Sequence, residues 1–299
     1  MSLASGDLTT PQRAAIWLPG TTTLPSAILS QLITSMSTMI YGKLNRSRLY
    51  SQQFIRTFSG VGVPQIILPD WPVTNITKVQ IGGSLATFVP LPQIAAGGST
   101  FGFGFGYRCV LWDNFLPGNP SVIDLINGSF CPGLQNVQVT YTAGYFVDKE
   151  PGTIPGTGPY TVTVTQGQGI WCRDGGVTYT DGTPFTPVTT LTGAGQYIIP
   201  TDALPGQYTF DAADANADVL ISYSFIPADL EEACNQMVGE RLSYRGRIGE
   251  ISKSLGGQET IRFSRGPLAR YQNNSLPPEV WDLIQPYVST IPTLLGSPQ

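Results

Sequence analysis

Apolar side chains recur at intervals of three and four residues in four stretches near the ends of the chain, which predicts amphipathic helices there. The first is short and begins at Pro11, with Thr10 as its cap. The second covers about residues 25–45 and carries one broad apolar stripe. The third runs from Pro227 to about Arg245, and the fourth is a short helix within residues 276–287.

The third helix has the most complete set of helix signals. Acidic residues fall in its first turns and Arg241 and Arg245 near its end, so both ends complement the helix dipole. Pro227 suits the first helical position, and Gly246 ends the helix. We therefore expect its apolar face to pack against the rest of the chain. That face consists of Leu230, Ala233, Cys234, Met237, Val238 and Leu242.

From residue 51 the apolar period changes to two, which predicts strands. Residues 54–58 and 65–68 flank the turn-forming stretch 60–64, and this arrangement predicts a hairpin. Further strands are predicted at 77–81 and 137–145. Residues 97–112 alternate glycine with aromatic residues, but no helix comes after them that could hold a phosphate. We therefore predict a strand or loop there instead of a phosphate-binding loop.

A second set of short strands comes after a linker rich in proline and glycine at residues 151–159. Asp-Gly and Pro-Gly turn signals separate the strands. About 75 residues of this kind can form a small independent β-sandwich or barrel. The strands are predicted at 160–165, 176–180, 196–199, 207–210 and 218–225.

Composition excludes several classes of protein. The chain has 299 residues with 34 glycines, 25 prolines and only 12% charged residues, which favours strands and turns over helices. It contains no histidine and no C-x-x-C pair, which excludes most zinc sites and every histidine-dependent triad. We expect four reduced and mostly buried thiols, no cofactor, no catalytic site, no signal peptide and no membrane span.

Charge is distributed unevenly, although the net charge is only −4. Residues 241–271 hold seven of the 16 basic residues against two glutamates, whereas residues 151–225 hold one arginine against six aspartates. We interpret residues 250–271 as a basic arm that binds a partner. The alternative is a solvated, disordered tail. Five apolar positions that a solvating tail would not need count against it: Ile251, Leu255, Ile261, Phe263 and Leu268.

Several stretches in a fixed order resemble the head–tail connector, or adaptor, proteins of long-tailed bacteriophages. Besides the two N-terminal helices, the resemblance covers residues 66–69, 74–81 and 137–145. Its strongest part consists of Ile226-Pro-Ala-Asp-Leu230, Arg245-Gly-Arg-Ile-Gly249 and Ser252-Lys-Ser-Leu-Gly-Gly257, and then Leu276-Pro-Pro-Glu-Val280. In the family, the Tyr-Thr-Ala-Gly-Tyr strand leads by a short loop into the Pro-Ala-Asp-Leu helix. Here 80 residues, 146–225, lie between the two.

The resemblance implies an α+β fold, with a helical connector core and a small antiparallel sheet formed by residues 1–149 and 226–299. Residues 150–225 would be an inserted all-β domain, a sandwich or barrel. The implied protein is a structural virion component of the phage neck, assembled in the host cytoplasm. Its copies would form a ring, twelvefold to match the portal, through which DNA passes without sequence-specific binding.

The partners implied are therefore the portal protein, the next neck or tail completion protein, and further copies of the chain. We expect the arm to contact the portal because it offers charge, one apolar anchor and a glycine pair that lets the backbone lie flat. The predicted portal-binding residues are Arg245, Arg247, Lys253, Ser254, Leu255, Gly256, Gly257, Arg262, Phe263 and Arg265.

An alternative function is carbohydrate or receptor binding through the β insert. Aromatic side chains could form a stacking surface for such a ligand, although they are equally suited to a core. The residues concerned are Tyr160, Trp171, Tyr179, Tyr197 and Tyr208.

Overall fold

The computed structural model describes residues 6–17, 25–46, 48–83, 87–90, 106–110, 121–201, 204–245, 252–255, 259–262 and 276–289. For the strands at 87–90, 252–255 and 259–262, the backbone alone is described. The chain divides into two compact units. Unit 1 comprises residues 1–47 and 147–288, and unit 2 comprises residues 48–146 and 289–299.

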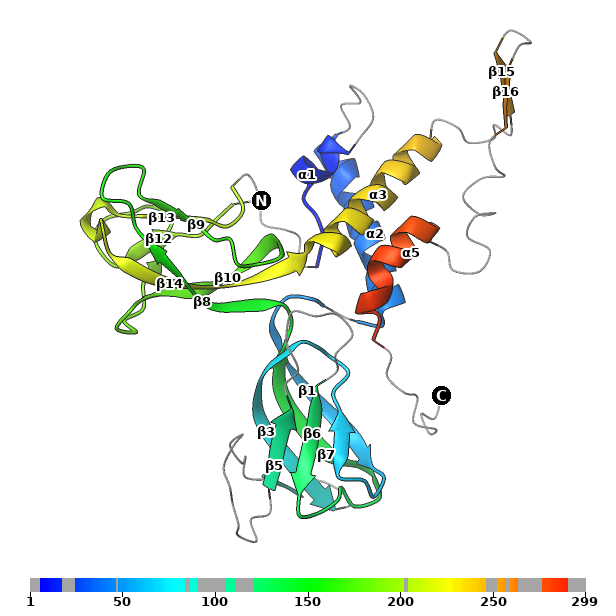
Figure 1. Ribbon diagram of the computed structural model, residues 1–299, viewed down its shortest axis with the longest axis vertical. Coiled ribbons are helices and arrows are strands. Elements are labelled where there is room, and N and C mark those ends of the chain that lie inside the picture. The colour runs from blue at the N-terminus through cyan, green and yellow to red at the C-terminus, as the bar shows by residue number, and fades with distance from the viewer. Residues whose placement is uncertain are drawn as a thin grey trace. The chain divides into compact units, whose positions relative to one another are not determined.

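The α-helices of the described chain all belong to unit 1, where α3 is central (Figure 1). They are α1 (Pro11–Ile16), α2 (Ser26–Leu44), α3 (Ala228–Arg245) and α5 (Pro278–Ile284), the last continued by the 3-10 turn η2 (Gln285–Tyr287). α3 contacts each of the other three. As predicted, Thr10 caps α1, since its hydroxyl accepts a hydrogen bond from the Arg13 amide.

Unit 1 also contains the two-stranded sheet of β15 (Ser252–Leu255) and β16 (Glu259–Arg262) and two larger sheets. The first has the order β10-β14-β8 and consists of β10 (Gly169–Tyr179), β14 (Asp218–Pro227) and β8 (Phe146–Thr153). The second has the order β11-β12-β13-β9 and consists of β11 (Thr186–Pro187), β12 (Gln196–Ile198), β13 (Gln207–Phe210) and β9 (Thr161–Thr163). A 3-10 turn, η1 (Ala212–Asp214), precedes β14, and β14 runs directly into α3 (Figure 1).

Unit 2 has two further sheets and a core of its own. One sheet has the order β1-β7-β3-β4, with β1 (Gln52–Gly60), β7 (Gly133–Ala143), β3 (Val73–Gly83) and β4 (Thr87–Pro90). The other has the order β2-β6-β5, with β2 (Gln65–Ile67), β6 (Val122–Ile126) and β5 (Gly106–Val110). Side chains from both sheets form one buried cluster that includes Val79, Ile123, Phe130 and Val139.

The expected fold class, an α+β protein with a helical connector core and a small antiparallel sheet, is wrong. Strands account for 42% of the described residues and helices for 26%, and no helical connector core is present among them. The physical reason lies in unit 2. Its strands β3 and β7 are each 11 residues long and bury β-branched and aromatic side chains against another sheet rather than against helices.

Two local predictions also differ from the structure. Residues 54–58 and 65–68 do not pair as a hairpin, because β1 pairs with β7 and β2 pairs with β6. Pro227 is the last residue of β14 rather than the first of α3. Of the stretch 97–112, residues 106–110 form strand β5, and the others lie outside the described residues.

The expected insert at residues 150–225 stays a prediction. Its ends fall inside elements, since β8 crosses residue 150 and β14 crosses residue 225. Strands β10 and β14 also contact α3, so the strands and helices of unit 1 are joined through this helix.

Candidate partner-binding surface

The candidate surface is the chain that leaves the C-terminal end of α3, and α3 itself is firmly embedded. The predicted apolar face of this helix is confirmed: Leu230, Ala233, Cys234 and Val238 are fully buried, and Met237 is 5% exposed. Leu242, one turn before the end, is half-buried. The helix is therefore a fixed base from which the arm begins.

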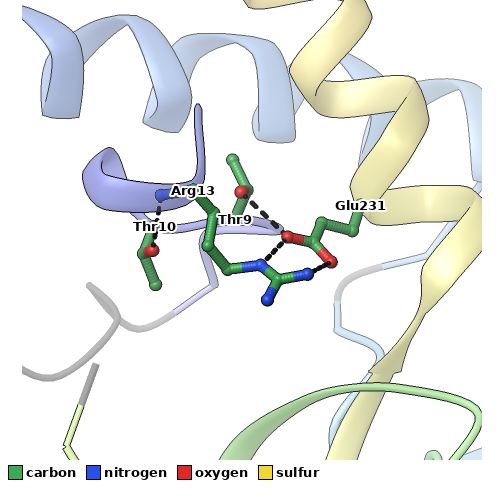
Figure 2. A network of polar contacts seen from close by, with 4 residues as sticks. All are labelled: Thr9, Thr10, Arg13 and Glu231. Carbon is green, nitrogen blue, oxygen red and sulfur yellow. Dashed lines mark hydrogen bonds and ion pairs between the residues drawn. The ribbon is translucent and has the colours of Figure 1, made fainter. Parts of the chain in front are cut away.

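A buried carboxylate ties the N-terminal segment to α3 (Figure 2). Glu231 accepts hydrogen bonds from both Nε and an Nη of Arg13, the latter at 2.9 Å, and from the Thr9 hydroxyl at 3.3 Å. Only 6% of the Glu231 side chain is exposed, against 44% of Arg13. The bidentate pair orients α1 across the start of α3.

This pair was not predicted, because the acidic residues of the first turns were attributed to the helix dipole alone. A signal was present. Glu231 precedes Cys234 by three positions and Val238 by seven, which places it on the buried face of the helix. A charged residue in such a position requires a partner.

A second polar contact joins the N-terminal segment, α2 and α3. The Ser37 hydroxyl accepts a hydrogen bond from the Leu8 amide at 3.0 Å and lies 3.6 Å from the Cys234 sulfur. Burial raises the pKa of the Cys234 thiol to about 12. This cysteine is therefore a protonated core residue, as predicted, whereas Cys131 is exposed and Cys172 is half-buried.

The predicted portal-binding residues begin at the end of α3 and continue into a hairpin. Arg245 is the last residue of α3. The hairpin consists of β15 (Ser252–Leu255), which contains Lys253, Ser254 and Leu255, and β16 (Glu259–Arg262), which ends at Arg262. The remaining predicted residues lie outside the described residues: Arg247, Gly256, Gly257, Phe263 and Arg265.

The arm is therefore folded back rather than extended over this stretch. Ser252 pairs with Arg262 and Leu255 with Glu259 in an antiparallel register. Residues 250–271 have no helical period, and an extended arm of this length would reach ~70 Å. A hairpin roughly halves the reach of the residues it contains, but it presents two strand edges to a partner.

Of the five aromatic residues considered for a stacking surface, two are buried, whereas Tyr160, Trp171 and Tyr179 are half-buried. Tyr197 and Tyr208 are 1% and 0% exposed, and their hydroxyls donate to Asp174 at 2.6 and 3.0 Å. Burial raises the pKa of both phenols, and the hydrogen bonds to the carboxylate act in the same direction. The Trp171 indole donates to Tyr208 at 3.1 Å. This network fills the space between the two sheets, so Tyr197 and Tyr208 do not offer a stacking surface.

The described part of the chain contains no group of three His, Cys, Asp or Glu side chains placed to hold a metal ion. None of its helices is long and apolar enough to cross a membrane. A scan against protein-family models and a search of curated proteins gave no match.

Proposed function

We propose that this chain is a structural adaptor of a tailed phage, whose copies form a ring beneath the portal and join it to the next neck or tail component. The resemblance in sequence motivates the identity of these partners. The observation that supports a binding role is the hairpin β15–β16, which lies beyond a firmly embedded helix and whose strands pair, among the described residues, only with each other.

The proposed portal contact is the arm, with β15 at its centre. Packed side chains hold α3 on several sides, so the arm starts from a fixed point. A short strand with an open edge binds by adding to a partner's sheet, and alternate side chains enter pockets. Leu255 would be the apolar anchor and Lys253 the charged contact beside it.

The proposal is tested by substituting Leu255 with aspartate in the full chain and measuring binding to purified portal-containing heads by co-sedimentation. Loss of one anchor commonly costs ~2 kcal/mol, so we expect binding to weaken by about thirtyfold. Leu204→Asp is the matched control, because Leu204 is a leucine of the β insert that is 57% exposed. Unchanged binding of Leu255→Asp, with the control behaving as wild type, would refute the proposed contact.

Substitution at Leu255 is preferable to truncation after Gly249. Truncation would also remove α5, whose Val280 and Ile284 are 1% and 0% exposed and which contacts α3. A truncated chain that failed to bind could simply be misfolded.

DNA is the rival partner for the basic residues, and the salt dependence of binding distinguishes DNA from the portal. Binding to DNA falls steeply as salt rises, whereas an apolar-anchored contact survives.

A further inference from the structure

Strand β1 forms one edge of the four-stranded sheet of unit 2. It pairs with β7 on one side and with no described strand on the other. From Gln52 to Phe58 its register with β7 is unbroken. Most of its residues are exposed, and Ile55 has 63% of its surface accessible. Within the described part of the chain, the outer edge therefore offers a row of backbone N–H and C=O groups to a further strand.

In the described sheets other than the hairpin β15–β16, the remaining edge strands are protected against such pairing. Proteins protect edges with prolines, bulges, lysines or short length. β4 ends in Pro90, β8 contains Pro151 and the left-handed Lys149, and the pairing of β10 shifts register twice. The edge strands β2, β5, β9 and β11 have five residues or fewer. β1 has nine residues, without proline or lysine.

The single charge on β1 does not protect its edge either, because that charge is already paired. Arg56 donates to both carboxylate oxygens of Asp70, at 2.9 and 3.1 Å. Asp70 is 9% exposed and also accepts from the Tyr141 hydroxyl at 2.5 Å. The hydrogen bond to Asp70 raises the pKa of Arg56.

Exposed apolar side chains lie just beyond the end of β1. Val61 and Val63 are 51% and 44% exposed, and Leu134, at the start of β7, is 78% exposed. The Asn136 side chain holds this end in shape, since it accepts from the Gly60 amide at 2.7 Å and donates to the Cys131 carbonyl at 2.8 Å. A partner strand on β1 would have apolar surface to cover as well as backbone to pair with.

The hairpin β15–β16 is the complementary element. Each of its strands has four residues, and an isolated two-stranded hairpin is marginally stable in water. We propose that β16 of one copy adds to the open edge of β1 in a neighbouring copy, and that this contact joins copies in the ring. The inference rests on the proposed function for the ring. β16 is assigned to the contact between copies because β15 carries three of the proposed portal-binding residues. The edge of β15 would then be left for the portal.

Such a contact has the symmetry that a ring requires. β1 and β16 are different surfaces of the same chain, so the contact is head-to-tail, and each copy both gives and receives a strand. A head-to-tail contact closes into a ring when the rotation between copies divides a full turn. Residues 246–251 connect α3 to the hairpin, and a connection of this length can span ~20 Å when extended.

Cysteine cross-linking between copies tests the pairing. One population of the full chain carries Ile55→Cys or Thr57→Cys, and the other carries Thr260→Cys in β16. Both carry Cys131→Ser, because the native Cys131 is exposed. We expect the mixed populations to form disulfide-linked dimers under mild oxidation at least about tenfold more than either population alone. Equal cross-linking in mixed and unmixed samples at the highest soluble concentration would overturn the proposal.

A charge on the edge provides the second test. Ile55→Lys should lower the yield of the Thr57–Thr260 cross-link by about tenfold, since a lysine on an edge strand opposes pairing. Ile199→Lys is the control, because Ile199 is an exposed isoleucine of the β insert. Heads that bind the chain without any cross-link would refute the pairing and leave the adaptor function standing. Cross-links in a chain that binds no portal would refute the adaptor function and leave the strand pairing standing.

Discussion

Replacing Arg13 with alanine should destabilise unit 1 more than neutralising its partner Glu231 with glutamine. Arg13→Ala leaves a carboxylate that is 6% exposed without its cation, and only the Thr9 hydroxyl still donates to it. Glu231→Gln removes the charge but keeps an oxygen that can accept hydrogen bonds from the Arg13 guanidinium and the Thr9 hydroxyl. The two members of one ion pair should therefore differ in their effect, because one lies buried and the other reaches solvent.

The magnitudes depend on the two exposures. Breaking a fully buried ion pair costs ~3–5 kcal/mol, whereas an exposed pair contributes ~0–1 kcal/mol. Since 44% of the Arg13 side chain is exposed, we expect Arg13→Ala to cost ~2 kcal/mol and Glu231→Gln to cost ~1 kcal/mol. The double variant should be more stable than Arg13→Ala alone, because it no longer buries a charge without its cation.

Chemical denaturation followed by the helical circular dichroism signal would measure these differences, since the described α-helices all belong to unit 1. In thermal unfolding, ~2 kcal/mol corresponds to about 4–8 °C for a unit of this size. Asp218→Ala is the control within unit 1. Asp218 is exposed and accepts a hydrogen bond from the Thr153 hydroxyl at 2.7 Å, so its loss should cost less than ~0.5 kcal/mol. Equal effects of Arg13→Ala and Asp218→Ala would refute the importance of the buried carboxylate.

Two further predictions concern titratable groups. Burial raises the pKa of Tyr179 to about 12 and that of Tyr208 further, so the unfolded chain ionises these phenols first. The stability they contribute is fully present below pH 10 and lost as pH rises through 12, which denaturation midpoints across that range would show. With a thiol reagent, exposed Cys131 should react in the native protein and buried Cys234 only on unfolding, and equal rates would contradict this.

The helices were predictable from the sequence because their signals are local. α2 and α3 begin and end within a residue or two of the positions expected from apolar spacing, and the cap at Thr10 was identified correctly. Most strands of the β insert were also predicted, since turn residues mark their ends. β11 was not predicted, and β8 continues to Thr153, into the stretch predicted as a linker. The predicted start of β10 was also wrong. This strand begins at Gly169, seven residues before the predicted start, because two register shifts break its alternation of buried and exposed residues.

Strand pairing could not be derived in the same way. The stretch after β1 contains glycines and a proline that also suit a hairpin, so the nearest strand was the natural partner to expect. The actual partner, β7, comes after β6 in sequence and is selected by the burial of Phe54 and Phe58 beside Tyr141 and Val139. The choice of partner depends on which strand faces meet in three dimensions. An alternating sequence pattern shows which face of a strand is apolar but does not show which strand lies beside it.

The candidate site likewise has parts that a local sequence pattern predicts and parts that depend on contacts between distant residues. The base of the arm was predictable, because the face of α3 repeats along one helix. The Arg13–Glu231 pair spans 218 positions in sequence, and the open edge of β1 is defined by which strand it lacks. The spacing along α3 shows that Glu231 is buried, but neither its partner Arg13 nor the open edge of β1 has a local sequence pattern. A buried charge and an unprotected edge each require a complement, and for the edge the chain itself contains one candidate, the hairpin beyond α3. In the proposed assembly, one contact between copies would complement both the edge of β1 and the hairpin β15–β16.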